Sequence, residues 1–112
     1  MTEDKVKRKL RAILAADVKD YSRMMGEDEV GTYHTLTRYL ELIRSIISDH
    51  EGRIFSSPGD AVMAEFASVI DAVQCAVKFQ EKVESENADL PEDRKMQFRI
   101  GVNLGDVIHD GA

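Results

Sequence analysis

The chain has 112 residues, of which 43% are hydrophobic and 32% are charged, and its formal net charge is −6. This length fits one small domain, and the composition is that of a folded globular protein rather than of a long disordered segment. An acidic chain has nothing to offset the repulsion of nucleic-acid phosphates, so we expect no nucleic-acid partner. A nucleotide bound by such a chain would need divalent metal to screen its phosphates.

The sequence also limits the compartment and the membrane relationship of this segment. Its longest apolar runs are far shorter than the roughly 20 residues of a membrane span, so we expect no membrane partner here. The single cysteine, Cys75, cannot form an internal disulfide, which suits a reducing cytoplasm. Residues 1–10 are basic without an apolar core and are interpreted as an N-terminal lead or linker, with the domain itself over 11–112.

The first half of the chain predicts a strand, a helix and a second strand. The apolar run from Arg11 to Val18 is typical of a buried strand that ends next to an acid. Residues 19–26 are polar and are expected to form a connection. Apolar residues spaced by three and four from Val30 to Ile47 indicate a helix that stops near Gly52. Residues 53–57 then predict the second strand.

The second half predicts a hairpin, a helix and a further strand. Pro58-Gly59 indicates a tight turn before a strand over 61–66, which places Asp60 at or next to the hairpin tip. Ser68 is expected to cap a helix. The expected apolar face of that helix consists of Val69, Ala72, Val73, Ala76, Val77, Gln80 and Val83. A polar loop over 87–95 leads to a strand over 96–102, and residues 107–108 are expected to begin a short fifth strand.

This order of elements predicts an α+β fold of the ferredoxin-like type, βαββαβ, with an antiparallel sheet and both helices on one face. The first and third strands are neighbours in this arrangement, so Asp17 and Asp60 should emerge at one sheet edge. Two close carboxylates repel each other unless a cation lies between them or one of them takes a proton, and oxygen ligands suit Mg²⁺ or Mn²⁺. From the residues alone, solvated turn or capping roles for these acids remain open.

Three stretches around these acids resemble, in the right order, the motifs of class III nucleotidyl cyclase catalytic domains of the bacterial type. Residues 15–22, Ala-Ala-Asp-Val-Lys-Asp-Tyr-Ser, resemble the first metal motif. Residues 52–66, with Gly-Asp at the expected hairpin tip, resemble the second. Residues 98–107 are similar to the family's strand Gly-x-x-x-Gly-(Asp/Glu)-Val. The matches together extend from about residue 8 to residue 111.

The resemblance implies conversion of ATP or GTP to the 3′,5′-cyclic monophosphate and pyrophosphate. Asp17 and Asp60, with the main-chain oxygen of Val18, would carry two Mg²⁺ or Mn²⁺ ions that activate the ribose 3′-hydroxyl and hold the phosphates. The resemblance also implies that the triphosphate is contacted by the backbone N–H groups of Val18, Lys19, Asp20, Tyr21 and Ser22. Ser56 and Gly59 are the other implied nucleotide-binding positions. The family's sites lie between two domains, so a head-to-tail homodimer is also implied.

The chain departs from the family pattern at three places. Ser56 stands where many members carry a purine-reading Lys, so the choice between ATP and GTP is open, and Asp20 replaces a frequent glycine. The family's later helix, with an Asn and an Arg that stabilise the transition state, has no counterpart before Ala112. We therefore predict a truncated domain that is inactive by itself. Two alternatives are a degenerate cyclase-like regulatory module that dimerises without turnover, and a ferredoxin-like binding domain with coincidental motifs.

Overall fold

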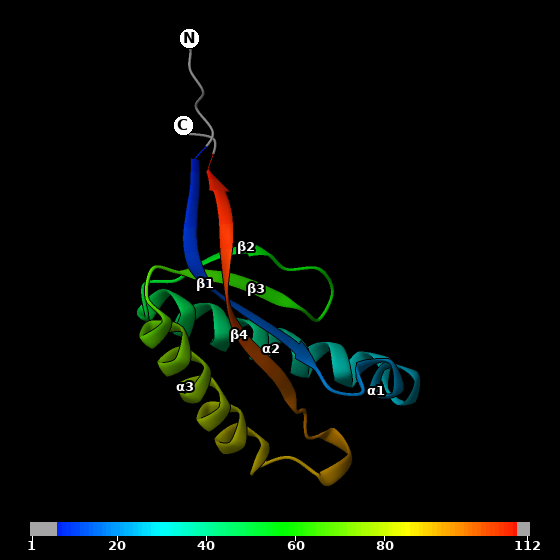
Figure 1. The fold of residues 1–112 in the computed structure, drawn as a ribbon. Coiled ribbons are helices and arrows are strands. Elements are labelled where there is room, and N and C mark those ends of the chain that lie inside the picture. Colours follow the sequence, from blue (N-terminus) through cyan, green and yellow to red (C-terminus); the bar gives the residue numbers. More distant parts are fainter. Residues whose placement is uncertain (1–6, 110–112) are drawn as a thin grey trace.

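A four-stranded antiparallel sheet with strand order β2-β3-β1-β4 forms the centre of the computed structural model, which describes residues 7–109 (Figure 1). The elements in chain order are β1 (Lys7–Val18), α1 (Tyr21–Glu27), α2 (Glu29–Asp49), β2 (Arg53–Ser56), β3 (Val62–Phe66), α3 (Val69–Asn87), a 3₁₀ turn η1 (Glu92–Arg94) and β4 (Phe98–His109). The long helices α2 and α3 cover the same face of the sheet. This confirms the predicted ferredoxin-like arrangement.

The core lies between this face of the sheet and the two long helices. Every second residue of β1 from Ala12 to Val18 is buried, as are Ala64 and Phe66 of β3. Side chains alternate between the two faces of a strand, so the odd-numbered residues of β1 lie on the opposite face, which none of the described helices covers. Asp17 therefore lies on the uncovered face.

The helices begin where their capping residues predict. The Ser68 hydroxyl accepts hydrogen bonds from the N–H groups of Ile70 and Asp71, which confirms the predicted cap of α3. The Asp28 carboxylate caps α2 in the same way, by accepting from the Gly31 N–H at 3.0 Å. Neither cap needs a partner outside its own turn, which is why sequence reasoning finds such helix starts readily.

The buried face of α3 differs from the predicted one. Ala72 and Val83 are buried as expected, but Val69, Val73 and Val77 are 44%, 45% and 54% exposed. Cys75 and Phe79 take their place in the core. Val73 and Val77 lie beside β4, which is an edge strand in the described part of the chain, so no further strand covers them there.

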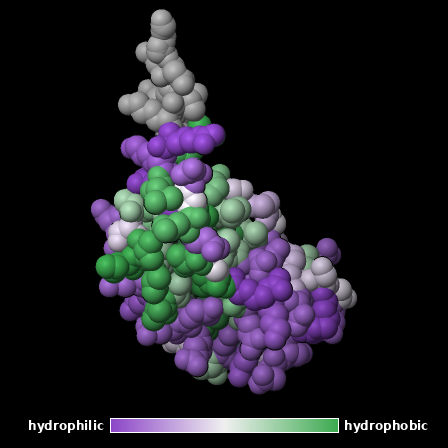
Figure 2. Space-filling model, viewed as in Figure 1, coloured by the Kyte–Doolittle hydropathy of each residue, from purple (hydrophilic) through white to green (hydrophobic). Residues whose placement is uncertain are grey.

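A groove of about 1010 Å³ runs between α3 and β4. Val73 and Val77 line it from the helix, and Phe98, Ile100 and Val102 line it from the strand. Figure 2 shows apolar side chains gathered on this side of the molecule, in the same view as Figure 1. This part of the surface is therefore more apolar than the charged faces of α1 and α2.

Two predicted boundaries are corrected by tertiary contacts. Residues 19–26, expected to be a connection, include all but the last residue of the seven-residue helix α1. Its Met24 is buried, and the Met24 carbonyl oxygen accepts a hydrogen bond from the Thr32 hydroxyl. The predicted strands over 96–102 and 107–108 are not separate, because residues 98–102 and 107–108 both belong to the single twelve-residue strand β4. It stays continuous because it pairs with β1 along its whole length, from Val18↔Phe98 to Lys7↔His109.

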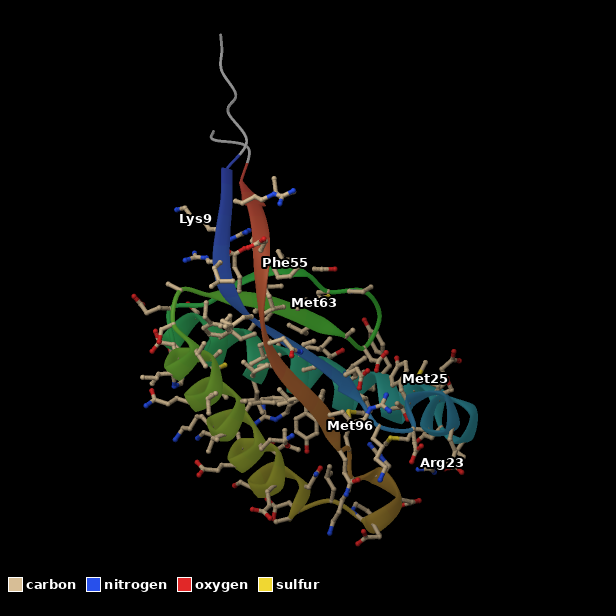
Figure 3. All side chains as sticks on the ribbon, viewed as in Figure 1. Lys9, Arg23, Met25, Phe55, Met63 and Met96 are labelled. Atoms are coloured by element: carbon tan, nitrogen blue, oxygen red, sulfur yellow. The ribbon has the colours of Figure 1, made fainter. Side chains whose placement is uncertain are left out.

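The strand β1 likewise begins at Lys7, inside the stretch expected to be a lead, while residues 1–6 of that stretch lie outside the described residues. The outer parts of β1 and β4 form a two-stranded ribbon that extends away from the helices and carries Lys9 (Figures 1 and 3). Among residues 7–109, no helix is both long enough and apolar enough to cross a membrane.

Candidate metal and nucleotide site

Asp17 and Asp60 lie at the same edge of the sheet and are linked through Val18, the last residue of β1. The Val18 N–H donates a hydrogen bond of 2.9 Å to the Asp60 Oδ2 atom, and Asp17 directly precedes Val18. The last pair of the β1–β3 ladder is Ala16↔Val62, so the end of β1 and the hairpin turn lie side by side. This is the juxtaposition that the strand order predicts.

The turn between β2 and β3 holds Asp60 in place. The Ala61 N–H donates to the Pro58 carbonyl oxygen at 2.9 Å, and the Ser57 hydroxyl donates to the Ala61 carbonyl oxygen. Gly59 has φ of 56°, in the left-handed region that favours glycine. No heavy atom lies within 4 Å of the position that a Cβ would take, so the requirement for glycine here comes from the backbone and not from space.

The segment after Asp17 forms a tight turn and then α1. Asp20 has φ of 59°, also in the left-handed region, which an Asp side chain tolerates better than most others. This backbone conformation explains why a glycine can stand at the same position in the family motif. The Asp20 side chain is exposed and makes no capping hydrogen bond to α1.

The expected backbone donors are only partly free. The Lys19 N–H donates to the Gln97 carbonyl oxygen at 2.8 Å, and the Val18 N–H is bound to Asp60. Tyr21 and Ser22 are in the first turn of α1, where N–H groups have no partner within the helix. Of the expected donors, the structure thus already engages Val18 and Lys19 in the fold.

Arg99 is a member of this site that sequence reasoning did not identify. Its Nε–H donates to the Asp17 Oδ1 atom at 2.9 Å, and the two residues are direct partners in the β1–β4 ladder. The hydrogen bond to Asp17 and its negative charge, with smaller contributions from Asp20 and Asp60, raise the pKa of Arg99 above its ordinary value. Its position in the alternating pattern of the last strand was visible in the sequence, but its pairing with Asp17 depends on the strand register.

A shallow hollow of about 380 Å³ lies on the uncovered face beside the carboxylate of Asp17. Small residues form much of the floor of this hollow. Ser56, the position implied to contact the purine, does not line it. The lining includes Ala15, Asp17, Ala61, Met63, Arg99 and Gly101. Figure 3 shows Met63 projecting from the sheet near Phe55.

The oxygen donors of this edge fit a magnesium or manganese ion. Within residues 7–109, no group of three or more His, Cys, Asp or Glu side chains could enclose a metal by itself. Asp17 and Asp60 thus supply two carboxylates, and a main-chain oxygen, water and phosphate oxygens would complete the coordination. Mg²⁺ is usually bound in this way, through one or two carboxylates with water and substrate phosphates.

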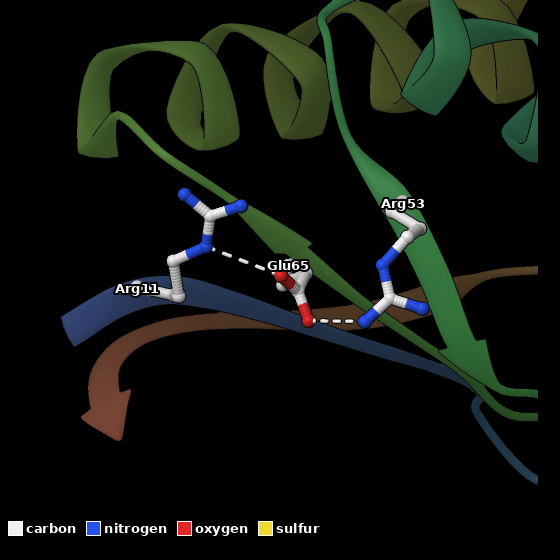
Figure 4. Close-up of polar contacts among 3 residues, drawn as sticks. All are labelled: Arg11, Arg53 and Glu65. Atoms are coloured by element: carbon white, nitrogen blue, oxygen red, sulfur yellow. Dashed lines mark hydrogen bonds and ion pairs between the residues drawn. The ribbon is translucent and has the colours of Figure 1, made fainter. Parts of the chain in front are cut away.

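A second charged cluster lies further along the same face and is distinct from the site (Figure 4). The buried Glu65 carboxylate accepts from Arg11 Nε at 3.1 Å and from Arg53 Nη2 at 2.7 Å. Burial opposes ionisation of Glu65, but the two arginine hydrogen bonds outweigh it and hold the pKa of Glu65 below its ordinary value. The cluster joins β1, β2 and β3.

Comparisons with known proteins agree with the fold and the motifs. No family model matches the chain. The chain is 46% identical over 110 residues to "Putative adenylate cyclase 3" of Rhizobium meliloti (strain 1021), which covers 96% of this chain and 19% of that protein. It is 23% identical over 100 residues to "Serine/threonine-protein kinase pkn2" of Myxococcus xanthus. This match covers 86% of this chain and 12% of that protein.

Solved structures show the same architecture. The adenylate/guanylate cyclase/hydrolase from Silicibacter pomeroyi superimposes with a TM-score of 0.83 and 35% identity over 93% of this chain and 61% of that chain. The guanylyl cyclase Cya2 superimposes with a TM-score of 0.78 at 22% identity, over 91% of this chain and 57% of that chain. The second likeness bears on the fold alone.

The fold, the ordered motifs and the identity to these proteins define the chain as part of a nucleotidyl cyclase catalytic domain. It belongs to the class III adenylyl/guanylyl cyclases. The chain spans about a fifth of its curated cyclase relative and about three fifths of the Silicibacter pomeroyi structure.

Proposed function

We propose that the protein to which this chain belongs converts ATP or GTP to the 3′,5′-cyclic monophosphate and pyrophosphate. The hydrogen bond from the Val18 N–H to Asp60 carries this proposal, because it keeps Asp60 beside Asp17 at one sheet edge. The identity to a protein named as an adenylate cyclase supports the same reaction class. Residues 11–112 would be the part of the catalytic domain that binds the metal ions.

Asp17, Asp60 and the main-chain oxygen of Val18 are the proposed metal ligands. Two Mg²⁺ or Mn²⁺ ions bound there would promote ionisation of the ribose 3′-hydroxyl and screen the triphosphate. The chain's own contribution is positional. One oxygen of Asp60 is held by Val18, which fixes the orientation of the carboxylate, and Asp17 is held on the uncovered face by the pleat of β1.

The proposed nucleotide contacts lie on the two turns that flank the carboxylates. The N–H groups of Tyr21 and Ser22 are the donors best placed for phosphate oxygens, whereas Lys19 would first have to release Gln97. Because Gly59 has no side chain, the backbone of the hairpin turn can approach a ligand closely. Ser56 offers the purine a hydroxyl instead of a charge, so the preference between ATP and GTP is left open in this proposal.

Assembly and completeness are further parts of the proposal. We expect a head-to-tail homodimer with the site at the interface, which is the assembly that the resemblance to class III cyclases implies. The 112-residue chain alone is expected to be inactive, because none of the residues 7–109 corresponds to the Asn and Arg that the family resemblance implies for stabilising the transition state. Charge that develops on the transferring phosphoryl group would then lack a partner.

A regulatory module without turnover is the second candidate function. The absence of a base-reading lysine at Ser56 favours it, since such a domain could keep the fold and the dimer while losing substrate selection. In that case the carboxylate pair would serve structure or nucleotide sensing. Cyclic nucleotide output of the full-length protein separates the two candidates.

The decisive experiment compares Asp60→Asn with Asp49→Asn in the full-length protein. Asn at position 60 keeps an oxygen for the Val18 N–H but loses the charge that a metal ion needs, so output should fall at least about 100-fold. Asp49 is an exposed acid at the end of α2, outside the site and the family motifs, and its variant should retain wild-type output. Wild-type output from Asp60→Asn would refute the cyclase proposal.

A further inference from the structure

The uncovered face of the sheet carries three arginines whose acidic partners differ. Arg11 and Arg53 both bind the fully buried carboxylate of Glu65, which needs them because an unpaired charge there would be costly (Figure 4). Arg99 instead binds Asp17, and both of these side chains are open to solvent, with 68% and 43% exposure. Arg99 is therefore the arginine of this face whose partner can be taken over by another cation.

The contact occupies one oxygen of the carboxylate that the proposed function assigns to a metal ion. The Arg99 Nε–H lies 2.9 Å from Asp17 Oδ1, which is a charge-assisted hydrogen bond directed at a carboxylate oxygen. The same lone pair cannot serve the guanidinium and a metal ion together. A fixed positive charge at this distance also repels an approaching divalent cation.

The pairing of β1 with β4 brings Asp17 and Arg99 together, so their contact follows from the fold. Asp17 and Arg99 are direct register partners on adjacent strands, and the neighbouring pair Val18↔Phe98 anchors both strands because each of its side chains is buried. Opposite charges placed directly across a ladder attract each other. Without metal, Arg99 also neutralises part of the repulsion between Asp17 and Asp60, which keeps the end of β1 and the hairpin turn together.

We propose that Arg99 competes with the metal ion for the Asp17 carboxylate and so raises the metal concentration at which the site fills. This inference rests on the proposed function, since it takes Asp17 as a metal ligand. Exposed ion pairs are weak, so the metal ion wins the competition at sufficient concentration, and the effect is a shift of the binding curve rather than a block.

The test is a Mn²⁺ titration of the 112-residue chain, with free Mn²⁺ followed by electron paramagnetic resonance at fixed pH and ionic strength. Arg99→Ala should bind Mn²⁺ about two- to five-fold more tightly than the wild type, the range expected when a weak exposed ion pair is removed. Arg38→Ala is the matched control, since Arg38 forms an exposed pair with Glu86 on the long helices, and it should leave the Kd for Mn²⁺ unchanged. Circular dichroism confirms that each variant is folded.

Unchanged or weaker Mn²⁺ binding by folded Arg99→Ala would overturn the inference, because a residue that merely orders Asp17 should weaken binding when it is removed. Asp17→Asn distinguishes this failure from a failure of the proposed function. Loss of Mn²⁺ binding in Asp17→Asn together with an unchanged Arg99→Ala curve would overturn the competition alone. Wild-type Mn²⁺ affinity in Asp17→Asn would overturn the metal site itself.

Discussion

The Val18 N–H and the Asp60 carboxylate are joined by a hydrogen bond of 2.9 Å, and this contact connects the end of β1 to the turn between β2 and β3. Val18 is almost fully buried, so its N–H has little access to water as an alternative partner. One carboxylate therefore has two tasks: it satisfies a main-chain donor and it presents an oxygen at the proposed metal site.

This double role predicts that Asp60→Ala lowers the stability of the metal-free chain. The buried Val18 N–H would lose its acceptor, which costs about 1–3 kcal/mol of the free energy of unfolding. Asp60→Asn keeps an acceptor oxygen and should lose less than half as much. Urea unfolding followed by circular dichroism measures both variants, and equal stability of the two would show that the Val18 contact does not stabilise the fold.

The cluster around Glu65 predicts a dependence of stability on pH. Its pKa in the folded chain is lowered, so the cluster contributes its full stability above the unfolded pKa of about 4.3. That contribution is lost as the pH falls through the lower folded pKa. Glu65→Gln should reduce the free energy of unfolding by about 1–3 kcal/mol at pH 7, because Arg11 and Arg53 lose a charged partner.

The same substitution should also flatten the decline in stability between pH 5 and the acid limit, since Gln does not titrate. Chemical unfolding at a series of pH values tests this directly. Glu81→Gln on the exposed side of α3 is the matched control and should leave the pH profile unchanged. Parallel profiles for the wild type and Glu65→Gln would contradict the proposed role of Glu65 in acid stability.

Two glycines with equal space around them predict opposite results on substitution by alanine. Neither Gly59 nor Gly26 has a heavy atom within 4 Å of the position that a Cβ would take, so packing is not the difference. Gly59 has φ of 56°, and Ala there should cost about 1–2 kcal/mol. Gly26 lies within α1, where Ala should be neutral or stabilise by up to about 1 kcal/mol.

Thermal unfolding of the two glycine variants provides the comparison. A lower Tm for Gly59→Ala and an unchanged or higher Tm for Gly26→Ala is the expected pair of results. A similar Tm for both variants would mean that the hairpin turn adopts another backbone conformation in solution, and the geometry around Asp60 would need revision.

The features that the sequence predicted well depend on local chemistry or on strand order. Ser68 caps α3 through its own turn, and Pro58-Gly59 closes the hairpin through a contact three residues away. Asp17 and Asp60 are far apart along the chain, but the order of elements alone makes β1 and β3 neighbours. Once that order is recognised, the acids at their ends must share a sheet edge.

The features that the sequence missed depend on contacts between distant segments. The helix α1 is too short for periodicity to reveal, and its buried Met24 is fixed by a contact with Thr32 of α2. Sequence reasoning divided β4 near Gly105, whereas pairing with β1 keeps it continuous. The buried face of α3 was misplaced because Val69, Val73 and Val77 form as regular a stripe as the residues that enter the core.

The sequence by itself thus determined the fold class and the family, and it predicted that Asp17 and Asp60 lie at one sheet edge, because these follow from periodicity, turn chemistry and ordered motifs. Only the tertiary structure decided which charges meet. The pairing of Arg99 with Asp17 requires the register of β1 against β4, and the assignment of Arg11 and Arg53 to Glu65 requires three strands in place. The register of a strand depends on which of its side chains enter the shared core. That packing forms only when the strands and helices of the domain come together.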